Sequence, residues 1–404
     1  MGLVPSKSVL RRVVSGGAAL ALLVGLATCQ HLSIRTATDR VKPATSASPA
    51  AGVLPLSLTV TPTNVARDVR PAVPVVVSAT NGRLTSVRLT TIKGIMVPGV
   101  TNSEGTRWTS SGTLAYGTRY SLSAAAVDGR NKTKTVSSAF TTVTPRRLVY
   151  PDVSPLAGET VGVGMPIIIS WSRPIPDQAA AERLLQVSTD KPVVGTWSWI
   201  SSHEVHYRPQ VYWPAYTHVT VDINVGRADL GDGVYGETSR RIAFTIGSSV
   251  ISKVSNATKK MTVYQNGVPL RTIPVSMGKP STPTSAGIHV VLVKFAEKYF
   301  DSASFGVPRD SPDGYYTKVY WDTKFTYGGE YIHAAPWSVS QQGRRNVSHG
   351  CVNVSTSNAK WFYYLSKHGD IVQIVGTERA VRRGDGYSDW NVPWATYLAG
   401  SALH

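Results

Sequence analysis

Ser348-His349-Gly350-Cys351-Val352-Asn353, preceded by His333, is the stretch of this sequence that decides both its chemistry and its fold. A thiol attacks a carbonyl well only as the thiolate, so a catalytic cysteine needs a base such as imidazole nearby. Gly350 lets a substrate approach the backbone closely, and the amides of Gly350 and Cys351 are candidate donors to an oxyanion. The pattern predicts nucleophilic catalysis with Cys351 as nucleophile and His333 as its base.

The residues around this stretch, 250–376, predict a mainly β unit with one helix. Asn266-Gly267 stands between two apolar runs and signals a two-residue hairpin, and Ile371–Val375 closes the unit as a strand. The helix is expected over Ser355–Lys367, with a serine cap at its start and Gly369 beyond its end. Cys351 lies shortly before this helix, where the helix dipole also favours a thiolate.

Two upstream stretches, 53–145 and 146–248, alternate apolar and polar residues in short runs separated by turns. They are similar in length and close on similar phrases, Ser138–Thr142 and Ile242–Ile246. Two tandem immunoglobulin-like β-sandwiches fit this pattern, without the paired cysteines of antibody domains. The tail, 377–404, carries Trp390 and Trp394 and is too aromatic to remain in water, so we expect a C-terminal subdomain packed back onto the third unit.

The first 29 residues predict export. Lys7, Arg11 and Arg12 precede an apolar run, Val13–Ala27, which is the layout of a signal peptide. The run ends in Leu26-Ala27-Thr28-Cys29, which resembles a bacterial lipobox whose cysteine is acylated, the alternatives being a chance cysteine and an uncleaved anchor. Residues 30–52 read as a flexible linker, so we expect a membrane-anchored protein that faces the cell wall from the periplasmic space.

Charge and cysteine count restrict the partners. A net charge of +18 suits nucleic acid, an anionic membrane or an anionic wall polymer, but the basic residues are scattered and no nucleic-acid module is present. Nucleic acid is therefore excluded as a partner. The chain has 2 cysteines, and with Cys29 in the leader no internal disulfide explains Cys351.

His333, its spacer and Ser348–Asn353 resemble the signature of L,D-transpeptidases with the YkuD fold. Met277-Gly278-Lys279, followed by Thr282-Pro283-Thr284 and Gly287, resembles a strand and loop of the same family. The two immunoglobulin-like domains and the aromatic tail resemble the mycobacterial members. The expected fold class is therefore mainly β: two tandem immunoglobulin-like β-sandwiches, then a YkuD-type catalytic domain with one main helix and a C-terminal extension.

The resemblance also implies roles for single residues. Cys351 is the acylated nucleophile, His333 the general base, and the backbone carbonyl of Ala334 completes the triad. His349, Gly350 and Cys351 shape the oxyanion site. The remaining implied residues contact substrate or line its pocket; they are Ser348, Asn353, the lid residue Tyr315, the pair Gly328 and Gly329, the wall residue Trp337, and Phe300, which stands where relatives place a methionine.

The implied reaction is acyl transfer between peptidoglycan stem peptides in cell-wall biogenesis and the maintenance of cell shape. Cys351 attacks the carbonyl of the third residue of a tetrapeptide donor, a diaminopimelate, and expels the terminal D-alanine. The side-chain amine of an acceptor diaminopimelate then resolves the thioester and forms a 3→3 cross-link. The resemblance further implies acylation of Cys351 by carbapenem β-lactams, and no cofactor is required.

A separate pattern, Asp229-Leu230-Gly231-Asp232-Gly233, lies in the second β stretch. Two carboxylates beside glycines can hold Ca²⁺ with help from backbone carbonyls. The segment resembles a calcium-binding turn of mycobacterial relatives, with ligands at Asp229, Asp232 and Gly233. The alternative is an acidic surface turn.

Two other function classes stay open. An L,D-carboxypeptidase or another hydrolase would use the same Cys351 and His333 and differ only in resolving the thioester with water. A non-catalytic wall-binding lipoprotein is disfavoured because both residues are intact. A papain-like peptidase would place the cysteine before the histidine, and here the order is reversed.

Overall fold

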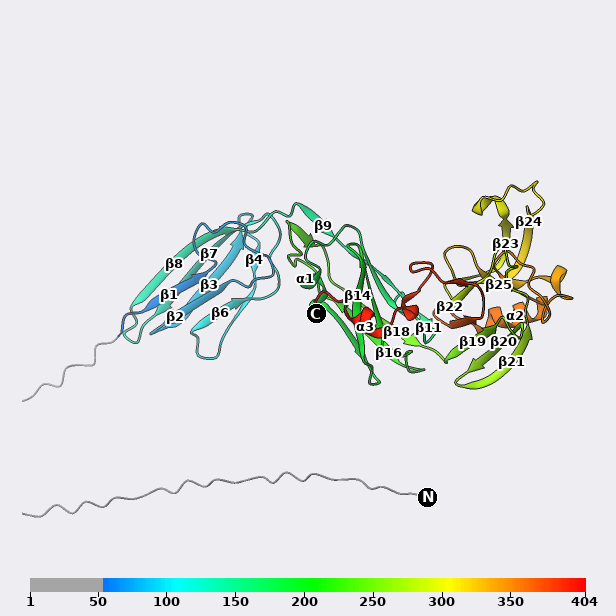
Figure 1. Ribbon diagram of the computed structural model, residues 1–404. Helices are drawn as coiled ribbons and strands as arrows, with labels where there is room; N and C mark the ends of the chain where they lie inside the picture. Colours follow the sequence, from blue (N-terminus) through cyan, green and yellow to red (C-terminus); the bar gives the residue numbers. More distant parts are fainter. Residues whose placement is uncertain (1–53) are drawn as a thin grey trace, which may run out of the picture. The chain divides into compact units, whose positions relative to one another are not determined.

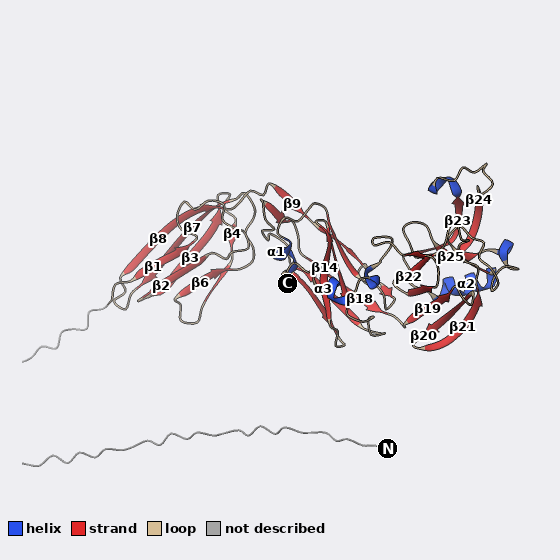
Figure 2. Ribbon diagram, in the orientation of Figure 1, coloured by secondary structure: helices blue, strands red, loops and turns tan. Residues whose placement is uncertain are grey.

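The computed structural model describes residues 54–404, except for the side chain of Phe305. The expected signal peptide, Cys29 and the linker lie outside the described residues. No helix within 54–404 is long and apolar enough to cross a membrane. Strands dominate the described chain, which confirms the mainly β fold class (Figure 2).

The first β-sandwich, blue to cyan in Figure 1, has two four-stranded sheets. Its strands are β1 (Ser57–Thr61), β2 (Val76–Thr80), β3 (Arg83–Thr91), β4 (Met96–Val97), β5 (Gly99–Thr101), β6 (Arg107–Ser110), β7 (Arg119–Val127) and β8 (Thr133–Thr141). The sheets have the orders β1-β2-β6-β5 and β4-β3-β7-β8. Inward-facing residues of both sheets, including Trp108, Tyr120 and Phe140, form the core.

The second β-sandwich has a larger core, to which Trp171, Trp197 and Trp213 contribute. Its elements are β9 (Arg147–Val149), β10 (Pro151–Ser154), β11 (Thr160–Val161), β12 (Ile167–Trp171), α1 (Gln178–Glu182), β13 (Leu185–Thr189), β14 (Gly195–Ser201), β15 (Glu204–Pro209), β16 (His218–Ile223), β17 (Val234–Gly236) and β18 (Arg240–Ile246). The two sheets run β10-β12-β15-β14 and β11-β18-β16-β13, and β17 pairs with β9.

The third unit combines a six-stranded sheet, β21-β20-β19-β27-β22-β28, with a four-stranded sheet, β23-β24-β25-β26. Its elements are β19 (Val250–Ser255), β20 (Lys260–Gln265), β21 (Val268–Pro274), β22 (Ser285–Val290), β23 (Val293–Asp301), the 3₁₀ helix η1 (Ser302–Phe305), β24 (Tyr316–Lys324), β25 (Tyr331–Ala334), the 3₁₀ helix η2 (Pro336–Ser338), β26 (Val352–Val354), α2 (Thr356–Leu365), β27 (Ile371–Val375) and β28 (Arg379–Ala380). The helix α2 packs against β24 and β25.

The predicted hairpin is confirmed. Gln265 pairs with Val268, so Asn266 and Gly267 are its two loop residues. Both have positive φ, 50° and 83°, as a type I′ turn requires. The predicted strand Ile371–Val375 is β27.

The predicted helix is confirmed, but its end is earlier than expected. Ser355 caps α2 by accepting from the amide of Asn358, and the helix ends at Leu365. Ser366 is already extended, with φ −73° and ψ 150°. The chain then turns through Gly369, which has φ 92°, and the Lys367 amide donates to the Asp370 carboxylate at 2.7 Å across this turn.

The tail packs onto the third unit, as expected, but it also packs onto the second β-sandwich, which was not expected. Its first part joins the third unit, where β28 pairs with β22. The 3₁₀ helix η3 (Asp389–Asn391) contacts both β22 and the second β-sandwich, and α3 (Trp394–Leu398) packs on β14 of that sandwich. There the Arg208 guanidinium lies 4.9 Å from the ring of Trp390 and 4.3 Å from that of Tyr397. A guanidinium over an aromatic ring is attracted to the ring electrostatically, in addition to the apolar contact. The composition of the tail could not predict this contact, because Arg208 belongs to another domain.

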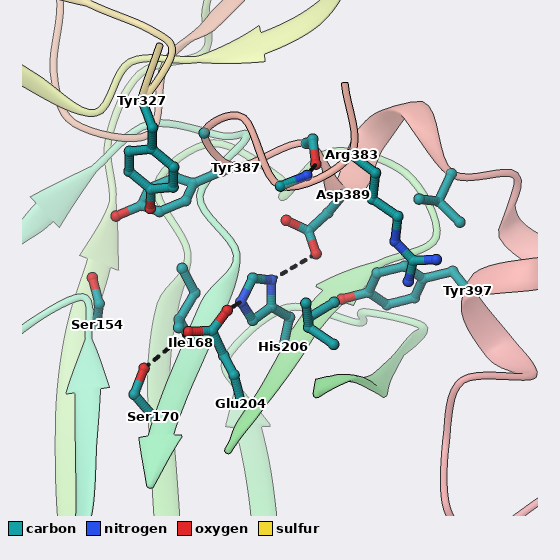
Figure 3. A pocket seen from close by; sticks show the side chains of 15 residues that line it. Ser154, Ile168, Ser170, Glu204, His206, Tyr327, Arg383, Tyr387, Asp389 and Tyr397 are labelled. Atoms are coloured by element: carbon teal, nitrogen blue, oxygen red, sulfur yellow. Dashed lines mark hydrogen bonds and ion pairs between the residues drawn. The ribbon is translucent and has the colours of Figure 1, made fainter. Parts of the chain in front are cut away.

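An ion pair between β15 and the tail adds to this packing (Figure 3). His206 Nδ1 lies 2.8 Å from Asp389 Oδ1, and His206 Nε2 lies 3.0 Å from Glu204 Oε1. Burial alone would lower the pKa of His206, but the two carboxylates outweigh it and raise that pKa to about 9. His206 is therefore an ionised link between the second β-sandwich and the tail.

Candidate active site

A cleft of about 810 Å³ in the third unit collects the predicted site residues. Its walls come from β23, β24 and β25 and from the segment before β26. Of the predicted residues the cleft is lined by Phe300, Tyr315, Gly328, Gly329, His333, Trp337, Ser348, His349, Cys351 and Asn353. Gly350 lies buried behind this lining.

His333 is held in one tautomer by its own strand. It sits in β25, is 3% exposed, and its Nδ1 lies 3.0 Å from the carbonyl oxygen of Ala334. A carbonyl only accepts, so Nδ1 carries the proton and Nε2 has a free lone pair. Burial lowers the pKa of His333 to about 4, which keeps the ring neutral at pH 7 and able to take a proton.

Cys351 lies in the same cleft as this imidazole. The strands β25 and β26 pair in parallel with His333 opposite Asn353, two residues after Cys351. The Cys351 Sγ lies 3.8 Å from the carbonyl oxygen of Gly329. Burial raises the pKa of the Cys351 thiol to about 12. A hydrogen bond from the backbone amide of Tyr331 opposes this effect and lowers the pKa, but burial outweighs it. The resting pair is therefore a neutral thiol and a neutral imidazole.

The loop before Cys351 is fixed by two hydroxyl groups. Ser348 Oγ donates to the Cys351 carbonyl at 2.6 Å and accepts from the Gly350 amide at 3.1 Å. Thr284 Oγ1 donates to the Gly350 carbonyl at 2.7 Å, which gives the upstream Thr282-Pro283-Thr284 segment a structural role. Gly350 has φ 130°, a conformation that side chains rarely adopt. Of the two predicted oxyanion donors, the Gly350 amide is thus engaged within the loop in this structure.

The flap formed by β23, η1 and β24 covers the cleft. Tyr315, just before β24, has its ring 5.4 Å from that of His349. Burial first, and then the charge of Cys351 in the same cleft, raise the pKa of Tyr315 to about 12. Asp313, beside it, lies 2.6 Å from Lys279 Nζ and 3.5 Å from His349 Nε2. His349 therefore contacts the lid.

Aromatic rings surround His333. The ring of Phe300 lies 5.2 Å from the His333 ring and 4.8 Å from that of Tyr331, and the ring of Trp337 lies 6.1 Å from His333. Trp337 itself is 57% exposed, so it can cover an extended peptide in the cleft. These rings exclude water from the imidazole, which is the burial that depresses its pKa.

Asn353 and Gly328 are tied to neighbouring loops. The Asn353 amide group donates to Ser338 Oγ at 3.1 Å, and its side-chain oxygen is buried with no partner in the described chain. The Asn353 side-chain oxygen is therefore free to accept a hydrogen bond from a substrate. The Gly328 amide donates to Asp385 of the tail at 2.6 Å.

Sequence reasoning missed a charged group at the cleft wall. Glu330, 5% exposed, accepts from the amide and hydroxyl of Ser285 and pairs with Arg379 of β28. A Cβ on Gly350 would lie 3.4 Å from Glu330 Oε1, so this carboxylate packs against the loop that carries Cys351. Glu330 stands close to His333 in sequence, but its partners Ser285 and Arg379 are remote in the chain, and no local pattern joins them.

The turn expected to bind calcium lies in the second β-sandwich, away from the cleft residues. Asp229 Oδ2 lies 3.3 Å from the guanidinium of Arg70, and Asp229 Oδ1 accepts from the Gly231 amide. Within residues 54–404 no group of three or more His, Cys, Asp or Glu side chains could hold a metal ion. The donor set around Asp229, Asp232 and Gly233 fits calcium poorly, because an arginine already neutralises one of two carboxylates.

The family models match both halves of this architecture. Residues 249–374 match the model YkuD, described as the L,D-transpeptidase catalytic domain, and residues 66–229 match Big_10, a bacterial Ig domain. The fold and the site thus define a YkuD-type transferase behind bacterial immunoglobulin-like domains.

The relatives extend the match to nearly the whole chain. L,D-transpeptidase 2 of Mycobacterium tuberculosis (strain CDC 1551 / Oshkosh) is 42% identical over 356 residues, covering 88% of this chain and 87% of that protein. L,D-transpeptidase 5 of Mycobacterium tuberculosis (strain ATCC 25618 / H37Rv) is 35% identical, covering 86% and 77%. Among solved structures, L,D-transpeptidase LdtMt1 in complex with imipenem is 36% identical and covers 55% of this chain and 97% of that chain, with a TM-score of 0.49. The chain belongs to the L,D-transpeptidase family, as its sequence predicts.

Proposed function

We propose that this transpeptidase forms 3→3 cross-links between peptidoglycan stem peptides, with Cys351 as nucleophile and His333 as general base. One observation carries the proposal: His333 keeps Nε2 free because Nδ1 donates to the Ala334 carbonyl, and this neutral base shares a cleft with the thiol of Cys351. A neutral imidazole can take the thiol proton at the moment of attack.

In the first step the Cys351 Sγ forms a bond to the carbonyl carbon of the third residue of a tetrapeptide donor, a diaminopimelate. The thiol proton passes to His333 Nε2 and then to the nitrogen of the terminal D-alanine, which leaves as the C–N bond breaks. In the second step the side-chain amine of an acceptor diaminopimelate attacks the thioester. The C–S bond breaks, and the proton of the amine returns through His333 to Sγ. The balance needs no cofactor.

Carbapenem acylation of Cys351 follows from the same chemistry, because opening a β-lactam ring is also attack on a carbonyl by an activated thiol. The leader in residues 1–29 supports export and anchoring at the cell membrane, facing the wall. The mass of the mature N-terminus distinguishes an acylated Cys29 from a cleaved or retained leader.

The test compares purified wild type with Cys351→Ala and His333→Ala, given a disaccharide tetrapeptide donor and excess amine acceptor. Mass spectrometry measures cross-linked dimer against free tripeptide. We expect dimer from the wild type and a loss of at least about a thousandfold in each variant, since both residues act on the reacting bond. His203→Ala, an exposed histidine of the second β-sandwich, is the matched control and keeps full activity.

Dimer formation that survives either change would refute the assignment of the catalytic pair. Tripeptide without dimer in the wild type would make the enzyme an L,D-carboxypeptidase that uses the same two residues. An incubation with a carbapenem that leaves the mass of the Cys351 peptide unchanged would count against the nucleophile.

A further inference from the structure

The segment Pro283–Ser285 is attached to the loop that carries Cys351. Thr284, which is 0% exposed, donates from its hydroxyl to the Gly350 carbonyl at 2.7 Å and accepts from the Gly278 amide at 2.9 Å. Because this hydroxyl makes both a donor and an acceptor contact, its orientation is fixed. A charged group bound to the segment is therefore held in one place relative to the Cys351 loop.

Glu330 is a buried carboxylate bound to this segment. It accepts from the Ser285 amide at 2.9 Å and from the Ser285 hydroxyl, and it is 5% exposed. A Cβ on Gly350 would lie 3.4 Å from Glu330 Oε1. Because two donors of a buried residue hold the carboxylate, it cannot turn into the solvent.

Arg379 of β28 supplies the opposite charge. It is the ladder partner of Ser285, donates from Nε to the Pro283 carbonyl at 3.0 Å, and pairs with Glu330. The side chain is half-buried and lines the cleft. A backbone carbonyl and a carboxylate thus fix the guanidinium at the cleft wall, next to the loop of Cys351.

The charge of Glu330 acts on Cys351. Burial comes first among the causes that raise the pKa of Cys351, and the charges of Glu330 and Asp322 add to it. Burial also raises the pKa of Glu330, against the hydrogen bonds from Ser285 and the charge of Arg379, which lower it. Acylation develops negative charge on sulfur and on the substrate oxygen, so an unpaired carboxylate at this place would oppose it.

We propose that Arg379 is a positioning residue for the acylation of Cys351 that acts through Glu330, because it keeps the fixed carboxylate neutralised beside the thiol. This inference rests on the proposed function, in which Cys351 is acylated, and it assigns part of that site to the C-terminal tail. Loss of Arg379 alone should slow acylation, since the charge of Glu330 is then unpaired. Loss of both charges together should restore the rate, which the loss of a purely structural contact would not do.

Acylation by a carbapenem measures this effect without an acceptor peptide. In this step Cys351 Sγ forms a bond to the lactam carbonyl carbon, the lactam C–N bond breaks, and the thiol proton passes through His333 to the lactam nitrogen. Mass spectrometry of the purified full chain gives the second-order rate of acylation at pH 6 and at pH 8.

The variants compared with the wild type are Arg379→Gln, Arg379→Lys and the double variant Glu330→Gln/Arg379→Gln. Arg382→Gln is the matched control. Arg382 is an exposed residue of the same tail that forms no ion pair within residues 54–404 and does not line the cleft.

At pH 8 we expect Arg379→Gln to be acylated at least about tenfold more slowly than the wild type, the scale of one unit charge within about 10 Å at an effective dielectric constant of about 20. At pH 6 the loss should be less than about threefold, because burial and Asp385 raise the pKa of Glu330 and the unpaired group takes up a proton. The double variant should stay within about threefold of the wild type at both pH values. Arg379→Lys should do the same because it keeps the charge, and Arg382→Gln should react as the wild type does.

Alkylation by neutral iodoacetamide tests the same charge without Arg379→Gln, which could fail to fold. Glu330→Gln keeps Arg379 and removes the carboxylate, so the thiolate is more populated. We expect this variant to alkylate on the Cys351 peptide at least about threefold faster than the wild type at pH 8.

Acylation of Arg379→Gln at the wild-type rate at pH 8 would overturn the inference. An equal loss at pH 6 and pH 8, an equal loss in the double variant, or an alkylation rate of Glu330→Gln at or below that of the wild type would overturn it as well. Absence of carbapenem acylation and of cross-linked dimer from the wild type would instead contradict the proposed function. The alkylation rates, which need neither carbapenem nor peptide, would still decide whether Glu330 acts on the thiol.

Discussion

The link between His206 and Asp389 predicts a pH-dependent attachment of the C-terminal tail. His206 is 7% exposed and Asp389 4% exposed, so the pair is shielded from solvent (Figure 3). The perturbation is Asp389→Asn, which preserves shape and removes the charge. Arg379 of the same tail pairs with Glu330 at the cleft, so loosening the tail is also expected to affect the active site.

The magnitude follows from the pKa of His206. A rise from 6.5 to about 9 corresponds to about 3 kcal/mol of stability. Since the folded-state pKa is the higher one, this contribution is complete below about pH 6.5 and disappears as the pH rises through about 9. Removing one partner of a buried pair costs a similar amount, about 3 kcal/mol or more at pH 7.

Hydrogen exchange measured by mass spectrometry tests this locally, which avoids treating a multidomain chain as two-state. The opening free energy is measured for peptides covering 388–402 between pH 6 and 10, after correction for intrinsic exchange. We expect it to fall by about 3 kcal/mol over this range in the wild type, and to be low and nearly flat in Asp389→Asn. The matched control is Asp190→Asn, which breaks the exposed pair between His218 and Asp190 and should leave these peptides unchanged.

The reasoning fails if wild-type exchange in 388–402 shows no pH-dependent loss of protection between pH 6 and 10. It fails equally if Asp389→Asn exchanges as slowly as the wild type at pH 7.

Two further predictions concern the cleft. Gly350→Ala should reduce kcat by about tenfold or more and also lower stability, because a side chain at φ 130° costs about 1–3 kcal/mol and displaces the loop of Cys351. Gly267→Ala, at φ 83° with open space around it, is the control: it should lower stability but not kcat, and equal activity losses in both would contradict the argument. Alkylation of Cys351 by iodoacetamide should be slow at pH 7.5 and still accelerate above pH 9, because burial raises the thiol pKa to about 12. A rate that is already constant between pH 6 and 8 would show a thiolate in the resting enzyme.

Much of the catalytic unit was predictable because its signals are local. The Asn266-Gly267 turn, the serine cap of α2 and the apolar run of β27 each depend on a few adjacent residues. The end of α2 was misplaced because Ser366 is already extended, ahead of the turn that contains Gly369 and the contact between Lys367 and Asp370.

Other features depend on residues that only the fold brings together. The tail's tryptophans predict burial but not the surface that buries them, and Arg208 of the second β-sandwich supplies it. The pairing of Glu330 with Arg379 likewise joins parts of the chain that are distant in sequence.

The sequence by itself determined the family and predicted its chemistry: an isolated thiol, a preceding histidine and a glycine next to the thiol are typical of the L,D-transpeptidase family, and they predict Cys351 as the nucleophile. The tertiary structure decided the state in which that chemistry rests. Burial and the Ala334 carbonyl make His333 a neutral base with one free nitrogen, and burial keeps Cys351 protonated. Protonation depends on desolvation and on partners in space, neither of which is encoded in the order of residues along the chain.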